Sequence, residues 1–103
     1  MKSREELQAK LEEALGSEYV YFQPPDGLRM NKGNRIVYSR EELSIRKADN
    51  KPYEYYDKYS VTLVSKDPDW GLVHEIPNLF LHCRHDRRYV ADNLYHDTFI
   101  IYY

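Results

Sequence analysis

The feature that most constrains this fold is the stretch from Tyr53 to Ser65, in which apolar and polar residues alternate. Successive side chains of an extended chain point to opposite faces, so one face of this stretch would carry Tyr53, Tyr55, Tyr59, Val61 and Leu63. The stretch contains no Gly and no internal Pro, either of which would weaken a strand. We therefore predict a long central antiparallel strand with one buried face.

Length and composition indicate one small globular domain. A chain of 103 residues allows a single domain, covering residues 1–103. The net charge is -2, so charge alone would not hold the chain on a nucleic-acid backbone. The only cysteine, Cys83, cannot form an intrachain disulfide. The sequence has no apolar signal segment and no run of ~20 apolar residues, so we expect a soluble, intracellular protein without a membrane partner.

The N-terminal segment predicts an amphipathic helix over residues 3–15. Ser3 and Glu6 match a capping box, and Gly16 suits a left-handed C-terminal cap. The apolar stripe is narrow, which is typical of a helix that covers one side of a sheet; it consists of Leu7, Leu11, Ala14 and Leu15.

The region between this helix and the central strand predicts short strands and one exposed loop. An aromatic strand over 18–23 is ended by the turn residues of 24–27. Residues 28–35 form a basic, mobile loop. Another strand begins over Ile36–Tyr38, Leu43–Lys47 is a candidate edge strand, and 49–52 is a polar turn.

After the central strand the sequence predicts a helix of about two turns. Asp67 would be its N-cap, Pro68 its first residue, and Pro77 would end it. Its core-facing side would carry Trp70 and Val73, and Leu72 and Ile76 beside them. A strand follows over 80–85, and residues 87–94 continue it and add a turn. The last strand covers 98–103 and ties the C-terminus into the sheet. The predicted class is α+β, with a mainly antiparallel sheet of four to five strands.

Two clusters invite a catalytic or metal-binding interpretation. His82, Cys83 and His85, with His96, suggest zinc, but a strand points His82 away from its neighbours, and a closed site needs about four converging ligands. A second cluster is acidic and is better explained by residues that start a helix: Asp67, Asp69 and Glu75. No phosphate-binding loop is present. We therefore expect no enzyme, no metal and no cofactor.

A basic run in the predicted hairpin has two interpretations. Arg84, Arg87 and Arg88 are interleaved with Asp86 and Asp92. The interleaved acids favour a solvated hairpin with weak ion pairs. The alternative is contact with an acidic partner surface.

Four phrases of the sequence resemble small proteins from the head-to-tail region of long-tailed bacteriophages, and the tail-terminator (tail-completion) family most of all. They are Y-F-Q-P-P-D-G (21–27), A-D-N-K-P-Y (48–53), D-P-D (67–69) and R-R-Y-V-A-D-N-L-Y-H-D-T-F (87–99). Such proteins are also labelled minor capsid or minor tail proteins. In that family we expect a longer second helix than Gly71 and Pro77 permit here.

The resemblance implies a structural virion protein, assembled in the host cytoplasm. It would form a ring, expected to be a hexamer, at the head-proximal end of the tail tube, end tail assembly and join the tail to the head connector. Its partners would be further copies, the tail tube protein and head–tail connector or adaptor proteins. DNA would pass through the ring without sequence-specific contact.

The residues of this chain leave other functions open. One alternative is a neck or head-completion connector one layer above the tail. Others are a small metal-dependent hydrolase using His and Asp residues of 82–97, and a monomeric module that binds a host protein or RNA. For the ring, the expected interface residues are apolar or basic side chains of the loop and the hairpin: Leu28, Arg29, Met30, Lys32, Arg35, Arg87 and Arg88.

Overall fold

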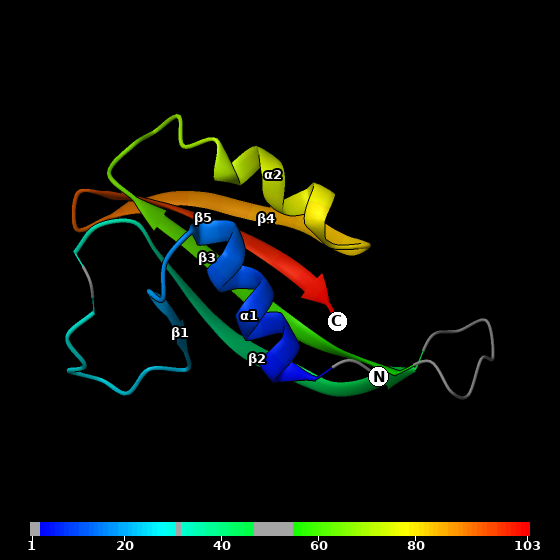
Figure 1. The fold of residues 1–103 in the computed structure, drawn as a ribbon. Helices are drawn as coiled ribbons and strands as arrows, with labels where there is room; N and C mark the ends of the chain where they lie inside the picture. The colour runs from blue at the N-terminus through cyan, green and yellow to red at the C-terminus, as the bar shows by residue number, and fades with distance from the viewer. Residues whose placement is uncertain (1–2, 31, 47–54) are drawn as a thin grey trace.

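The computed structural model describes residues 3–30, 32–46 and 55–103 (Figure 1). The elements in chain order are α1 (Arg4–Leu15), β1 (Val20–Phe22), β2 (Arg35–Arg46), β3 (Tyr55–Ser65), α2 (Leu72–Leu79), β4 (His82–Ala91) and β5 (Leu94–Tyr102). They form one five-stranded sheet in the order β1-β2-β3-β5-β4. Only the β1–β2 pair is parallel. The predicted α+β class is confirmed.

The middle strand of the sheet is β3, as the alternating pattern predicted. It pairs antiparallel with β2 on one side and with β5 on the other. Tyr59, Val61 and Leu63 are buried, which confirms the predicted inner face for these residues. Tyr53 lies outside the described residues, and nothing is described of the Tyr55 side chain.

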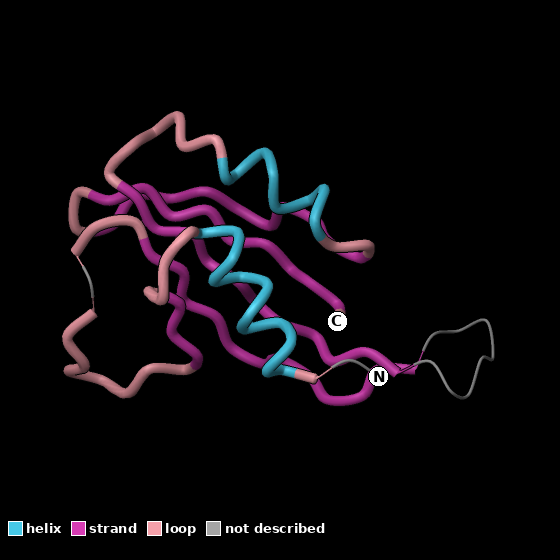
Figure 2. Tube along the Cα trace, in the orientation of Figure 1, coloured by secondary structure: helices cyan, strands magenta, loops and turns pink. Residues whose placement is uncertain are grey.

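Both helices lie on the same face of the sheet (Figures 1 and 2). Helix α1 packs on β1, β2 and α2, while α2 packs on β4. Leu7 and Leu11 of α1 and Ile76 of α2 are completely buried above the sheet. The core is therefore a single layer of apolar side chains between two helices and the inner face of the strands.

The ends of α1 follow the predicted capping signals. The Ser3 side-chain oxygen accepts a hydrogen bond from the Glu6 backbone N–H at 3.2 Å. Gly16 has a φ of 79°, and its N–H donates to the Glu12 carbonyl at 2.9 Å. Only glycine adopts this left-handed conformation without steric cost, so the sequence fixes where α1 stops.

The predicted boundaries of the second helix were wrong at both ends. Helix α2 begins at Leu72, after Gly71, and it continues past Pro77 to Leu79. Asp67 caps a turn instead of the helix: its side chain accepts from the Asp69 N–H at 2.9 Å. Pro77 is tolerated because it removes one hydrogen bond from a helix of only eight residues, which is held on the sheet by buried Leu72 and Ile76.

Several strands are longer than the sequence indicated. The segments 36–38 and 43–46 belong to one strand, β2, whereas we had expected a separate edge strand over Leu43–Lys47. Lys47 and the predicted turn over 49–52 lie outside the described residues. The first strand is shorter than 18–23, and the last begins at Leu94 rather than at residue 98.

The C-terminal residue is tied into the sheet, as predicted. The backbones of Tyr103 and Asp57 exchange two hydrogen bonds, at 3.1 and 3.0 Å. The Tyr103 ring also packs edge-on against Phe80, with 5.8 Å between centroids. These contacts attach the end of β5 to β3 and to the segment after α2.

Truncating the inner face of β3 should destabilise the whole domain. Leu63 is 1% exposed, so Leu63→Ala leaves a cavity and is expected to lower the free energy of unfolding by about 2–5 kcal/mol. Ser60→Ala, on the opposite face of the same strand, is the matched control and should change it by less than about 0.5 kcal/mol. Urea titration of both variants measures this; equal, small losses would show that the inner face is not the core.

Candidate interaction surface

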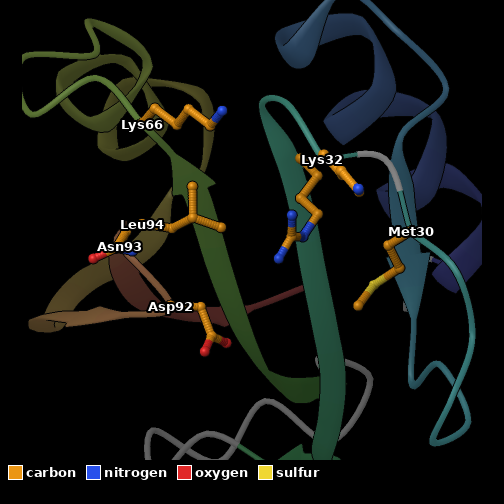
Figure 3. A pocket seen from close by; sticks show the side chains of 7 residues that line it. Met30, Lys32, Lys66, Asp92, Asn93 and Leu94 are labelled. Carbon is orange, nitrogen blue, oxygen red and sulfur yellow. The ribbon is translucent and has the colours of Figure 1, made fainter.

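A pocket of about 500 Å³ lies at one end of the sheet, between the loop that precedes β2 and the tip of the β4–β5 hairpin (Figure 3). Met30 and Lys32 approach it from the loop, while Asp92, Asn93 and Leu94 approach it from the hairpin. Arg35 and Lys66 complete the lining. Segments far apart in the sequence therefore share one amphipathic pocket.

Strand pairing explains how these residues meet. Arg35 opens β2 and pairs with Val64 near the end of β3, so it lies beside the point where Lys66 leaves that strand. On the other side of β3, Ser65 pairs with Tyr95, which places Leu94 next to Lys66 as well. The pocket is thus built on the ends of three adjacent strands, which give it a rigid base.

Polar contacts and turn residues fix the two walls of the pocket. The Ser65 hydroxyl, which is buried, donates to the Asn34 side-chain oxygen at 2.7 Å and accepts from the Asp67 N–H at 3.0 Å. The hairpin turn consists of Asp92 and Asn93, with φ values of 53° and 62°. Two successive positive φ angles are typical of a tight type I′ hairpin, and Asp and Asn tolerate them better than other non-glycine residues.

The pocket combines positive charge with apolar surface. Three basic side chains, Lys32, Arg35 and Lys66, line it with a single carboxylate, that of Asp92. Met30 and Leu94 supply the apolar part. An acidic residue flanked by apolar ones would satisfy both parts, so the site is suited to a protein partner.

The loop also presents a second, outward-facing part. Gly27 has a φ of 82°, and the Leu28 N–H donates to the Pro25 carbonyl at 3.2 Å, which closes a turn. Leu28 is 44% exposed, and Arg29 beside it is exposed. Among the interface residues predicted in the loop, Met30 therefore lines the pocket, while Leu28 and Arg29 form an outward-facing tip. The predicted mobility of this loop stays a prediction.

The two hairpin arginines expected at the interface point to opposite faces. A register shift between His85 and Arg87 sets Arg87 opposite Thr98, while Arg88 lies opposite Asp97. Arg88 is held within the chain: its Nη2 donates to the Pro68 carbonyl at 2.6 Å, and its Nε lies 3.7 Å from Asp97. The Arg87 guanidinium lies 5.3 Å from the ring centroid of Tyr89. Neither lines the pocket.

The residues considered for zinc do not converge. Cys83 and His85 face the helices, whereas His82 packs edge-on against Tyr56 and His96 stacks on Tyr89, both on the opposite face of the sheet. In residues 3–30, 32–46 and 55–103, no group of three His, Cys, Asp or Glu side chains could hold a metal ion. The strand register separates these four residues.

The Cys83 thiol is half-buried, which favours its unreactive protonated form in the folded chain. It packs against the core, and burial raises its pKa to about 11. At pH 8 roughly one folded thiol in a thousand would be ionised, against about a quarter in the unfolded chain, whose thiol pKa is about 8.5. Alkylation by iodoacetamide at pH 8 should therefore be slow for the native protein and fast in urea. Equal rates would show that Cys83 is not buried.

One histidine–carboxylate pair lies beside α2. His85 Nε2 is 3.0 Å from a carboxylate oxygen of Asp97, which is 3% exposed. A hollow of about 360 Å³ adjoins the pair, and its other lining residues are Val73, His74, Pro77, Arg88 and Phe99. None of these residues carries a hydroxyl or a thiol, so the pair has no nucleophile to activate among them.

Sequence reasoning missed half of the pocket. Four lining residues were not predicted as site residues: Lys66, Asp92, Asn93 and Leu94. The sequence predicted a turn within 87–94, and Asp92 and Asn93, which tolerate positive φ angles, could have located its tip. Nothing local to Lys66 reveals its place, which depends on the pairing of β2 with β3.

Comparison of the chain with family models, with curated proteins and with solved structures finds no match in any of the three. No helix of the described residues is long and apolar enough to cross a membrane.

Proposed function

We propose that this chain is a structural subunit of a long-tailed bacteriophage, a tail-terminator-like protein. It forms a ring, a hexamer in our proposal, at the head-proximal end of the tail tube. There it ends tail assembly and joins the tail to the head connector. The proposal rests on the sequence resemblance together with the position of the phrases that carry it.

The observation that carries the proposal is that three of these phrases gather at one end of the molecule. Residues 21–27 enter the loop, 67–69 follow β3, and 87–99 include the hairpin tip (Figure 1). The pocket lies between the loop and the hairpin tip, with Lys66, the residue just before the second phrase, in its lining. The fourth phrase, over 48–53, lies outside the described residues. Since these phrases hold no catalytic set, a shared contact surface explains their grouping.

The chemistry of this end suits a joint between proteins. A rigid sheet presents basic and apolar side chains around one pocket, and such a surface binds by complementarity without cofactor or reaction. In our proposal the pocket receives an acidic side chain of the neighbouring layer, whether tail tube or connector protein.

Removing the apolar side chains of the loop should impair assembly without unfolding the subunit. Leu28→Ala with Met30→Ala removes side chains that lie outside the buried core. The thermal midpoint should stay within about 2 °C, since surface changes cost little. In a phage complementation assay the variant should yield fewer completed virions and leave unjoined heads and tails.

Leu81→Ala is the matched control for this experiment. Leu81 is 89% exposed and precedes the far end of β4, away from the pocket. This variant should yield virions at the wild-type level. Normal assembly by the loop variant would remove the loop from the joint, and unfolding of its monomer would place the loop in the core.

The His85–Asp97 pair offers a direct test of the enzyme alternative. We expect the His85→Asn variant to support virion assembly nearly as well as wild type, because Asp97 keeps Arg88 as a partner. Electron microscopy of complemented lysates, with the thermal midpoint as a folding check, measures this. Complete loss of virions by a folded variant would contradict a purely structural role.

A further inference from the structure

The outer tip of the loop carries an apolar side chain beside positive charge. Leu28 is one of the large hydrophobic side chains left exposed, and Arg29 follows it directly. Lys32, which also lines the pocket, adds a second exposed cation three residues after Arg29. Neither Arg29 nor Lys32 forms an ion pair within the described part of the chain.

A groove between the two helices has the complementary character. It has a volume of about 290 Å³ and is lined by Glu13 and Ala14 of α1, Glu75 and Leu79 of α2, and Lys10. The Lys10 ammonium lies 4.9 Å from the ring centroid of Phe80, so its charge is directed toward an aromatic face. Leu79 is 37% exposed, and the Glu13 and Glu75 side chains are exposed. The groove therefore combines apolar surface with two carboxylates and one ammonium group, that of Lys10.

We infer that the loop tip of one copy of this chain docks into the helix groove of a second copy. Leu28 fills the groove against Ala14 and Leu79, while Arg29 and Lys32 face the carboxylates of Glu13 and Glu75. This inference rests on the proposed ring and names the two surfaces that join its subunits.

The arrangement of the two surfaces fits a ring. The loop and the groove are different patches, so the contact is heterologous and each copy both offers a loop and receives one. A rotation that closes after a fixed number of copies gives a ring. Opposite charges across the contact set its register and direction, and the paired apolar side chains exclude water.

Charge reversal on each side tests the contact. A loop variant carries Arg29→Glu and Lys32→Glu, and a groove variant carries Glu13→Lys and Glu75→Lys. At low ionic strength, where these charges are least screened, each variant alone should remain a monomer by size-exclusion chromatography with light scattering. An equimolar mixture should regain the wild-type assembly, because each loop then meets a groove of opposite charge. In an even-numbered ring the two variants would alternate.

A third variant controls for total charge. Glu5→Lys with Glu18→Lys changes the net charge by the same amount as the groove variant, at exposed positions outside the groove. It should assemble like wild type, and thermal midpoints should show that all variants fold.

Assembly by either reversed variant alone, or failure of the mixture to assemble, would overturn the inference. Loss of assembly in the control variant would do the same. So would a wild-type protein that stays monomeric at its highest soluble concentration. The virion assay of the variant with Leu28→Ala and Met30→Ala tests the proposed function separately. Completed virions can depend on the loop even if the groove is not its partner.

Discussion

Burial of the inner face of β3 is the interaction on which the rest of this structure depends. Tyr59, Val61 and Leu63 lie beneath Leu7 and Leu11 of α1 and Ile76 of α2, and all are inaccessible or nearly so. Such burial contributes about 25 cal/mol per Å² of apolar surface, which makes it the main favourable term in a domain of this size. Because β3 also pairs on both edges, losing this face would separate the helices from the sheet and release both neighbouring strands.

The buried strand also carries a polar network on its inner face. Asp57 is 7% exposed and lies 3.2 Å from the Arg40 Nε, and the Arg40 Nη2 donates to the Tyr59 hydroxyl at 3.1 Å. This hydrogen bond is the main reason that the pKa of Arg40 is raised. A buried carboxylate needs such partners, since an isolated charge is costly to remove from water. The network joins β2 to β3 where Arg40 pairs with Tyr59, within the same strand pairing that brings Arg35 beside Lys66.

The candidate surfaces lie outside the buried core. The pocket lies beyond the ends of β2, β3 and β5, and the helix groove lies on the solvent side of the buried layer. In our proposal, the basic, apolar loop and the acidic, apolar groove are the two surfaces that join subunits into a ring.

The sequence by itself determined the elements whose causes are local. Alternation at Tyr59, Val61 and Leu63 predicted the central strand, and Ser3 and Gly16 fixed the ends of α1. Signals that compete locally were misleading, since Asp67 caps a turn as readily as a helix. Only the tertiary structure decided the site. The bulge near His85 put Arg88, and not Arg87, on the face that His85 shares, and strand pairing brought Lys66 to the loop. These outcomes depend on register between segments distant in the chain, which no local pattern encodes.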